Sequence, residues 1–394
     1  MSLALSDAEG FLNQRLPQYT QWRQDLHRHP ELGFREHRTS GFVIDALRGM
    51  GLSPVTGLAG TGVVATLEGN RPGPVIGLRA DMDALPLQEH SDCDYASQEA
   101  GVAHACGHDG HVTMLLAAAE YLCREPDFPG TVRFIFQPAE EALGGARQMI
   151  EEGLFQQFPV DRVFALHNWP GLPAGQIAAR PGPVMASLDL FTIDIQAQGS
   201  HAALPHQGTD AIVTAGALIT AIQSICSRSI DAQDPLVISL TQVHGGESLN
   251  ALPDAVQLKG TIRALDSGAL ELARERLRAV VQGVCATRGL TGSIEIRAVY
   301  PVTRNDAAAA QYSIDRARAV FGESRVTTDY RPSMASEDFA FMLEAVPGCY
   351  AWIGTGRDVP LHHPAYDFND AVIPAGARYL IALVTGAEAL PAAA

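Results

Sequence analysis

The stretch PVIGLRADMDALP at residues 74–86 joins a short apolar run to two aspartates, Asp81 and Asp83. Two later stretches follow the same plan, an apolar run that ends in polar side chains: TVRFIFQPAEE at 131–141 and RVFALHNWP at 162–170. In the first of these two, Val132, Phe134 and Phe136 occupy alternate positions, as apolar residues do on one face of a strand. Each stretch therefore predicts a β-strand whose carboxyl end carries polar side chains.

Helical patterns separate the three predicted strands. Apolar residues recur at helical spacing from Val112 to Leu122, which predicts a helix from about residue 108, and a second helix is indicated near residues 145–152. This order of strands and helices is typical of an α/β fold with a mixed, mostly parallel sheet and helices on both faces. Because ligands gather beyond the carboxyl ends of such strands, we expect the polar side chains to meet at one edge of the sheet.

The region from about residue 187 to 298 follows a different order. Its pattern is strand, helix, strand, strand, helix, strand, which is the arrangement of ferredoxin-like domains. Joints rich in glycine and proline flank it, RPGPV at 180–184 and YPVTRND at 300–306. We therefore predict a ferredoxin-like α+β domain inserted into a first domain of two parts. The predicted boundaries are 1–184 for the first part, 185–299 for the insert and 300–394 for the second part.

Composition argues against several classes of protein. The chain has 394 residues, 46% of them hydrophobic, so it is long enough for two cores. Its formal charge of -16 argues against a surface for nucleic acid, since phosphate binding needs clustered Lys and Arg. No apolar run approaches the ~20 residues that cross a bilayer and no signal segment is recognisable, which predicts a cytoplasmic protein without a membrane partner. The six cysteines lack the spacing of a disulfide framework.

Thiol and imidazole side chains stand together in HACGHDGH at residues 104–111. Cys106 and His108 precede or begin the predicted helix, and their side chains are ligand types that zinc, manganese, cobalt and nickel accept. The helix dipole and a bound cation would both lower the pKa of the Cys106 thiol. The alternative is a buried cysteine beside a capping loop rich in His and Asp.

Carboxylate and imidazole donors follow the next two predicted strands. Glu140 and Glu141 are adjacent, so on an extended strand end their side chains point in opposite directions, and one can bind metal while the other holds a proton. A solvated acidic helix start is the alternative for this pair. For His167 the alternative is a hydrogen-bonded core histidine. Because all these donors share one edge of the sheet, we favour a hydrolytic metal centre.

Seven motifs along the chain resemble those of a known family. They are RADMDALP, HACGHDGH, FQPAEE, ALHNWP, SHAALPH, SEDF and LHHPAYDF, in that order. Their types and order resemble the M20 metallopeptidases, and specifically the amidohydrolases of aminoacylase, hippurate hydrolase and auxin-amino-acid conjugate hydrolase type. The resemblance runs nearly end to end, since DLHRHPELGF at 25–34 and NALPD at 250–254 also fit.

This resemblance implies a site for two divalent metal ions per subunit, Zn, Mn, Ni or Co. Its ligands would be Cys106, His108, Glu141, His167 and His362. Glu140 resembles the general base, and Asp83 resembles a carboxylate that orients a metal-side group without binding metal. On the insert, His201 would stabilise the oxyanion, while Asn250 and Arg263 would bind the carboxylate of the substrate.

One position departs from the family pattern. A small residue usually follows the histidine of the LH motif, whereas here Leu361 and His362 are followed by His363 and Pro364. Position favours His362 as the last ligand, and His363 is the alternative. Asp81 stands where other branches of the family carry a ligand histidine, a part that His108 would take here.

The activity implied by the resemblance is hydrolysis of a small N-acyl amino acid, such as a hippurate-like substrate, to a carboxylic acid and a free amino acid. Three alternatives stay open: a dipeptidase or aminopeptidase of the same family, a hydrolase in which Cys106 is a covalent nucleophile and His108 its base, and an inactive metal-containing binding protein. The insert would close over the first domain by a hinge motion during catalysis. Assembly of the chain into a homodimer or a homotetramer is left as an alternative to a monomer.

Overall fold

The computed structural model describes residues 3–141 and 144–390, which divide into two compact units. The first unit comprises residues up to 182, 304–331 and from 338 onward, and the second comprises 183–303 and 332–337. The predicted insert, 185–299, lies within the second unit. Residues 332–337 also belong to the second unit, although they lie outside the predicted insert. They contact it directly, since Ser333 bridges to Met185 and Arg263 donates hydrogen bonds to the Met334 carbonyl and the Ser336 hydroxyl.

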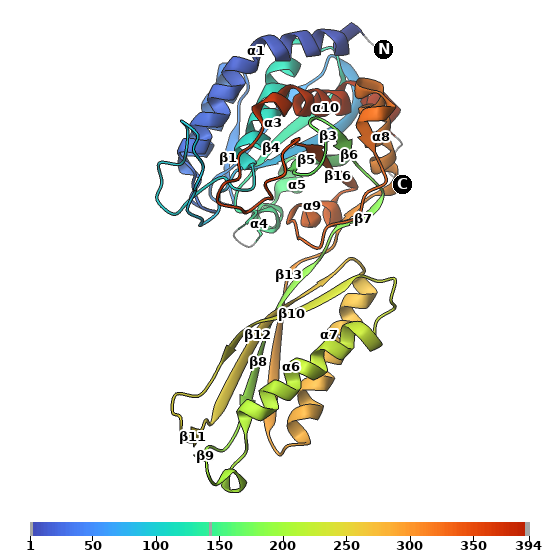
Figure 1. The fold of residues 1–394 in the computed structure, drawn as a ribbon. Helices are drawn as coiled ribbons and strands as arrows, with labels where there is room; N and C mark the ends of the chain where they lie inside the picture. Colours follow the sequence, from blue (N-terminus) through green and yellow to red (C-terminus); the bar gives the residue numbers. More distant parts are fainter. Residues whose placement is uncertain (1–2, 142–143, 391–394) are drawn as a thin grey trace. The chain divides into compact units, whose positions relative to one another are not determined.

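An eight-stranded mixed sheet forms the centre of the first unit, with the order β1-β2-β4-β3-β5-β16-β6-β15 (Figure 1). The four neighbours β4, β3, β5 and β16 are parallel, and antiparallel pairings lie on either side of them. The strands are β1 (Val55–Leu58), β2 (Gly62–Glu68), β3 (Arg71–Asp81), β4 (Pro129–Gln137), β5 (Arg162–Trp169), β6 (Ile177–Ala178), β15 (Val326–Thr327) and β16 (Gly348–Gly354).

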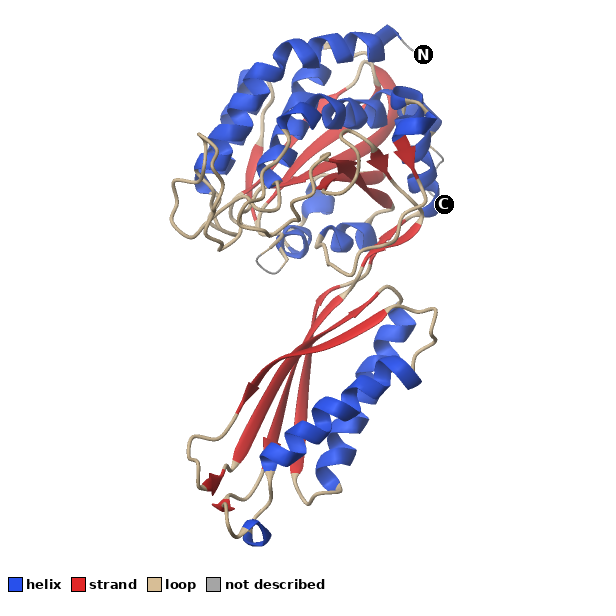
Figure 2. Ribbon diagram, in the orientation of Figure 1, coloured by secondary structure: helices blue, strands red, loops and turns tan. Residues whose placement is uncertain are grey.

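Two groups of helices cover this sheet, as Figure 2 shows. The first group is α1 (Leu3–Arg28), α2 (His37–Gly49), α3 (His108–Arg124), α8 (Ala307–Phe321) and α10 (Ile373–Thr385). The second group is α4 (Gly145–Glu151), α5 (Leu154–Gln157) and α9 (Phe339–Ala345). Alternate residues of β4 explain this arrangement, since Val132, Phe134 and Phe136 belong to the large core shared with α1, α3 and α10, whereas Ile135 does not. The predicted α/β fold, with helices on both faces of the sheet, is confirmed.

The second unit is a four-stranded antiparallel sheet of order β10-β12-β8-β13, on which two helices pack. Its main elements are β8 (Leu188–Gln196), α6 (Ala211–Arg228), β10 (Leu236–His244), β12 (Ala255–Ala264), α7 (Ser267–Ala286) and β13 (Thr291–Tyr300). Asp210 and Asp266 cap the two helices by accepting hydrogen bonds from Val213 N and Ala269 N. The predicted ferredoxin-like arrangement is confirmed.

Short strands complete the second unit and the joints. A two-stranded pair is formed by β9 (Ser200–His201) and β11 (Ala251–Leu252), and another by β7 (Gly182–Met185) and β14 (Thr303–Asn305) at the two joints. Among the described residues, α6 is long and apolar enough to cross a membrane by length and composition. One face of α6, which includes Leu218 and Ile222, packs into the core of the second unit, as expected of a core helix.

Candidate metal centre

The carboxyl ends of three neighbouring strands bring the predicted donors to one edge of the sheet. Asp81 ends β3, Glu140 and Glu141 follow β4, and His167 lies near the end of β5. The helix α3 begins at His108, directly after a long segment that leads from β3. Topology therefore gathers side chains that are far apart in the sequence, as expected for this edge of an α/β sheet.

Five side chains form one donor cluster. Ligand atoms of Cys106, His108 and Glu141 all lie within 4.8 Å of one another. Cys106 Sγ is 3.5 Å from His167 Nε2, and His362 Nε2 is 2.9 Å from Glu141 Oε1. The structure thus brings together all five side chains that the sequence predicts as ligands. Their role as ligands stays a prediction.

In each of the two buried histidines of the cluster, His108 and His167, a hydrogen bond occupies one ring nitrogen and leaves the other for a metal ion. His108 Nδ1 donates to the Asp83 carbonyl over 2.9 Å, and its Nε2 is buried without a hydrogen-bond partner among the described residues. His167 Nδ1 donates to the Asn168 carbonyl over 2.7 Å, so its Nε2 faces the Cys106 sulfur. A backbone carbonyl that holds the far nitrogen is the usual support of a ligand histidine. The donor set therefore fits divalent metal ions.

The protonation of the site without a cation points the same way. Burial raises the pKa of the Cys106 thiol well above its usual range, and the carboxylates of Glu141, Glu140 and Asp81 raise it further. Burial opposes the charged form of His108, but Asp81, Asp83 and Glu141 outweigh it and raise the pKa to about 10. Burial and the neighbouring His111 hold the pKa of His167 well below its usual value. A buried cluster with this excess of carboxylates attracts cations.

Asp83 holds the turn that carries the two glutamates. Its Oδ1 accepts a hydrogen bond from Glu140 N over 3.0 Å, and its Oδ2 accepts one from Glu141 N over 2.8 Å. Ala139, just before them, has a left-handed backbone with φ of 54°. The side chains diverge, since Glu141 pairs with His362 whereas Glu140 Oε1 accepts from Asp338 N over 3.3 Å. This division suits one glutamate that binds metal and one that carries a proton.

His362 and its neighbour His363 are separated by the local backbone. His362 is left-handed, with φ of 62°, and its N donates to the Ala105 carbonyl over 2.8 Å. This places its ring next to Glu141, with 52% of the side chain exposed. His363 Nδ1 instead accepts from Ala365 N within its own turn. The geometry favours His362 over His363 as the last ligand.

Sequence reasoning missed a second layer of support beneath the cluster. His111 Nδ1 donates to Asp81 Oδ1 over 2.6 Å, and its Nε2 accepts from Asn168 N over 3.0 Å. Asn168 Nδ2 donates to the Cys106 carbonyl over 2.6 Å, and its Oδ1 accepts from the Tyr366 hydroxyl. The spacing of His108 and His111 in HACGHDGH was the available signal, because residues three apart share one face of a helix.

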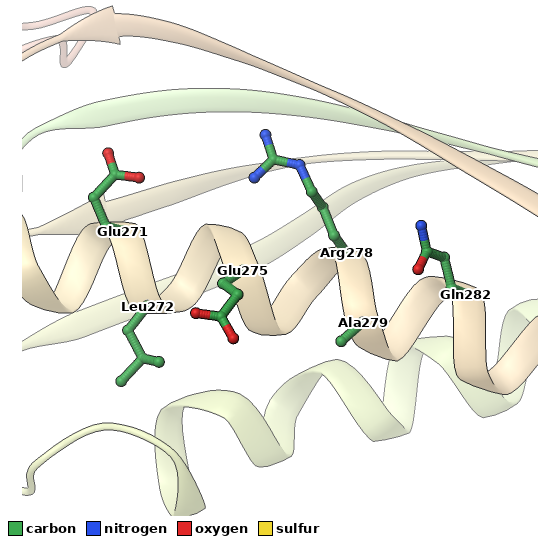
Figure 3. A pocket seen from close by; sticks show the side chains of 6 residues that line it. All are labelled: Glu271, Leu272, Glu275, Arg278, Ala279 and Gln282. Carbon is green, nitrogen blue, oxygen red and sulfur yellow. The ribbon is translucent and has the colours of Figure 1, made fainter.

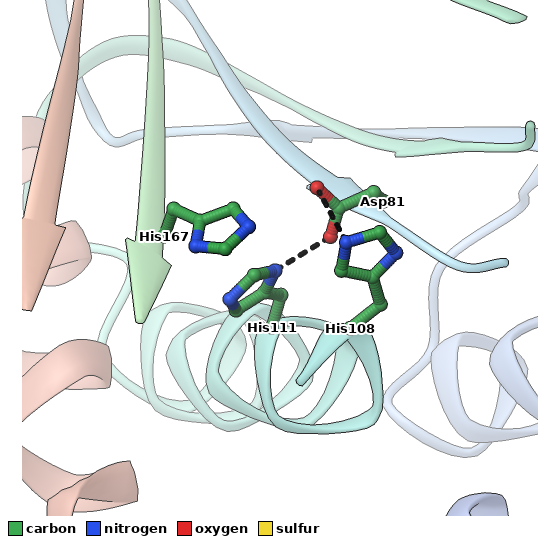
Figure 4. A group of neighbouring side chains, drawn as sticks. All are labelled: Asp81, His108, His111 and His167. Carbon is green, nitrogen blue, oxygen red and sulfur yellow. Dashed lines mark hydrogen bonds and ion pairs between the residues drawn. The ribbon is translucent and has the colours of Figure 1, made fainter. Parts of the chain in front are cut away.

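Figure 4 shows Asp81 beside the rings of His108, His111 and His167. Ligand atoms of these four residues also lie within 4.8 Å of one another. Both nitrogens of His111 are occupied by the hydrogen bonds to Asp81 and Asn168. We therefore assign His111 to the support of the cluster.

The three predicted residues of the insert lie in the second unit. His201 belongs to β9 and pairs with Ala251, and Ala202 N donates to the Asn250 carbonyl over 2.9 Å. Arg263 lies near the other end of β12, and eight residues of strand, about 25 Å, separate it from the start of that strand. Within one copy of the insert, the structure therefore keeps Arg263 apart from Asn250. Their assignment to one substrate carboxylate stays a prediction.

A shallow hollow elsewhere on the second unit carries no such chemistry. It lies along α7, and Figure 3 shows that a single helix supplies its lining. The lining residues are Glu271, Leu272, Glu275, Arg278, Ala279 and Gln282. Binding sites draw convergent groups from several elements, so the donor cluster of the first unit is the better candidate.

The fold and the donor cluster together define a metal-dependent hydrolase. The sequence model of peptidase family M20/M25/M40 matches residues 77–386 of the chain. The chain therefore belongs to this family, as its motifs predict. A solved Bacillus subtilis structure, described as a dinuclear metal binding peptidase from the M20 family, is 34% identical with a TM-score of 0.84 and covers 94% of this chain and 97% of that one. This likeness supports a centre for two divalent metal ions.

Two curated relatives are similar over nearly the whole chain. A protein named hippurate hydrolase from Campylobacter jejuni is 40% identical over 357 residues, which are 91% of this chain and 93% of that protein. A protein named N-acetyl-L-cysteine deacetylase from Bacillus subtilis is 38% identical over 359 residues, which are 91% of this chain and 85% of that protein. Both names describe hydrolysis of an N-acyl amino acid.

Proposed function

We propose that this chain hydrolyses the amide bond of N-acyl amino acids, hippurate-like substrates among them, to a carboxylic acid and a free amino acid. The observation that carries the proposal is the cluster of thiol, imidazole and carboxylate donors, mostly buried, beside a second, differently directed glutamate, Glu140. The relatives named for hippurate and for N-acetylcysteine support the same class of substrate.

The ions themselves are expected to be two of Zn, Mn, Ni or Co. Cys106, His108, Glu141, His167 and His362 would hold them. When bound, two divalent ions lower the pKa of water and polarise an amide carbonyl. A mixed set of sulfur, nitrogen and oxygen donors accepts all four metals, so the native one must be found by reloading the stripped protein.

Glu140 is the residue that moves the proton. Its carboxylate removes a proton from the attacking water and later delivers one to the departing amine nitrogen, because an amide anion is a very poor leaving group. The hydrogen bond from Asp338 N and the bond between Glu140 N and Asp83 fix its position. We further propose that His201 stabilises the oxyanion, that Asn250 and Arg263 bind the substrate carboxylate, and that the chain is cytoplasmic.

A covalent mechanism through Cys106 fits the site less well. A nucleophilic cysteine needs a lowered thiol pKa, which positively charged neighbours provide. Here burial and the carboxylates of Glu141, Glu140 and Asp81 hold the pKa of Cys106 well above its usual range. The sulfur is suited to a cation that stabilises its thiolate.

The test measures hydrolysis of hippurate and of acetylated amino acids together with metal content. We expect Glu140→Gln to keep both ions and to lose about 100-fold or more in kcat, because it removes the proton carrier. Glu141→Gln is the matched neighbour, and we expect it to lose metal as well as activity. A Glu140→Gln protein that holds two ions and hydrolyses at the wild-type rate would refute the proposed role. Activity that survives complete removal of metal would favour the Cys106 mechanism.

A further inference from the structure

A second group of metal-binding side chains lies at the carboxyl end of α1. His27, Glu89 and Cys93 bring an imidazole nitrogen, a carboxylate oxygen and a sulfur within 4.8 Å of one another. We propose that these three side chains, here called the α1 site, bind a zinc ion in addition to the two ions of the candidate metal centre.

The distances between donor atoms suit a tetrahedral ion. His27 Nε2 lies 3.2 Å from Glu89 Oε1, and Cys93 Sγ lies 3.9 Å from the same oxygen. Zinc binds nitrogen and oxygen at about 2.0–2.2 Å and sulfur at about 2.3 Å, so its tetrahedral ligands stand about 3.3–3.7 Å apart. Small rotations of the Cys93 and Glu89 side chains therefore allow all three atoms to reach one ion.

Neighbouring groups already orient two of the three donors. Asp109 Oδ2 accepts a hydrogen bond from His27 Nδ1 over 2.8 Å, which leaves Nε2 directed at Glu89. Such a carboxylate behind a histidine is the usual support of a zinc ligand. Glu89 Oε2 accepts from Ser97 N over 2.7 Å, and the Ser91 hydroxyl, 3.1 Å from Cys93 Sγ, is close enough to complete the coordination directly or through water.

The charges around the α1 site favour a cation. Arg23, a nearby positive charge, pairs with three carboxylates: Asp370 at 2.6 Å, Asp367 at 3.2 Å and Asp109 at 3.5 Å. The buried carboxylate of Asp109 faces both Arg23 and His27, and Glu89 adds a further negative charge on the other side of the imidazole.

Without an ion, a proton takes the same place. Burial opposes the charged form of His27, but hydrogen bonds to Asp109 and Glu89 outweigh it and raise the pKa to about 9. Zinc replaces this proton on Nε2, which keeps a positive charge between the same carboxylates. Binding also requires the Cys93 thiol to lose its proton, so zinc binds more weakly as the pH falls.

Such an ion would fasten a long irregular segment. Residues 82–107 join β3 to α3 without a helix or strand of their own, and this segment carries Glu89, Cys93 and, at its end, Cys106. Irregular segments longer than about 15 residues are uncommon in compact domains. An ion bound by His27, Glu89 and Cys93 would link the middle of the segment to α1. It would thereby restrict the motion of the loop that leads to the candidate metal centre.

The first test counts zinc in the full chain after stripping, reloading and dialysis. We expect the wild type to retain about one zinc ion per chain more than Cys93→Ser. Cys123→Ser is the matched control, since Cys123 is a half-buried cysteine of α3 outside the described donor groups, and it should retain as much zinc as the wild type. Equal zinc content in wild type and Cys93→Ser would overturn the proposal.

The second test uses cobalt and does not depend on hydrolysis. In a Cys106→Ser background, a thiolate-to-cobalt absorption band in the near ultraviolet can no longer come from the candidate metal centre. We expect the band to persist there, to vanish on adding Cys93→Ser, and to survive adding Cys123→Ser. Absence of the band in Cys106→Ser alone, or its survival without Cys93, would overturn the α1 site and leave the proposed hydrolase function untouched.

Discussion

Gly107 stands between Cys106 and His108, and its replacement by alanine should disturb both. Its φ of 85° is left-handed, and a Cβ atom there would meet the Asn168 amide nitrogen and, at 2.8 Å, the Tyr366 hydroxyl. Asn168 would have to move away from the Cys106 carbonyl that it now binds. Gly101 offers a matched control, because its φ of 75° is also left-handed and nothing lies within 4 Å of the added atom.

The two replacements differ by a calculable amount. The left-handed backbone costs an alanine about 1–2 kcal/mol at either position. At Gly107 alone, the displaced Asn168 also loses buried hydrogen bonds with the Cys106 carbonyl and Tyr366, which adds about 2–4 kcal/mol. We therefore expect Gly107→Ala to lower the free energy of unfolding of the first unit by about 3–6 kcal/mol, and Gly101→Ala by about 1–2 kcal/mol.

Tryptophan fluorescence during urea unfolding measures this difference in the first unit alone. The three tryptophans, Trp22, Trp169 and Trp352, all belong to that unit. A chelator removes the contribution of bound metal, and a separate zinc titration should show at least about a tenfold loss of affinity in Gly107→Ala, because Asn168 supports the Cys106 loop. If the two variants unfold at the same urea concentration, Asn168 does not hold this loop in the way described.

Two further predictions concern separate parts of the chain. In the second unit, Arg274 makes two hydrogen bonds of 2.5 and 2.7 Å to the buried Asp189. Arg274→Met should therefore lower the free energy of unfolding by about 3 kcal/mol, which far-ultraviolet circular dichroism would detect and tryptophan fluorescence would not. Arg278→Met, at an exposed position of the same helix, should change the stability little. In the metal-stripped protein, the pKa of His27 is about 9 against an ordinary 6.5, so the stability from its bonds is complete below pH 6.5 and is lost as pH rises to 9. Urea unfolding of His27→Gln across this range should show a smaller decline than the wild type, and an equal decline would exclude His27 as its source.

The fold was predictable from the chain because its signals are local. Alternating apolar residues in TVRFIFQP and helical spacing after His108 each report on one element, and the carboxyl ends of parallel strands meet by topology. The expected convergence of Cys106, Glu141 and His167 follows from these two facts. The residue types alone showed that these side chains can bind metal, without any distance between them.

The supporting contacts were not predictable, because they depend on side chains that meet only in three dimensions. Nothing in the spacing of His27 and Cys93 indicates that the segment before α3 packs against the end of α1. The bond from Asn168 to the Cys106 carbonyl likewise joins the ends of different elements. The choice of His362 over His363 depends on a left-handed backbone that no sequence pattern announces.

The discontinuous make-up of the first unit has a consequence for synthesis. Cys106, His108, Glu141 and His167 are translated before the insert, whereas β16, which lies beside β5 in the sheet, and His362 are translated after it. A nascent chain that has just completed the insert therefore lacks a central strand and one donor. At about 5–20 residues per second, the ribosome needs several more seconds to supply them. Full assembly of the centre is thereby postponed until translation is nearly finished.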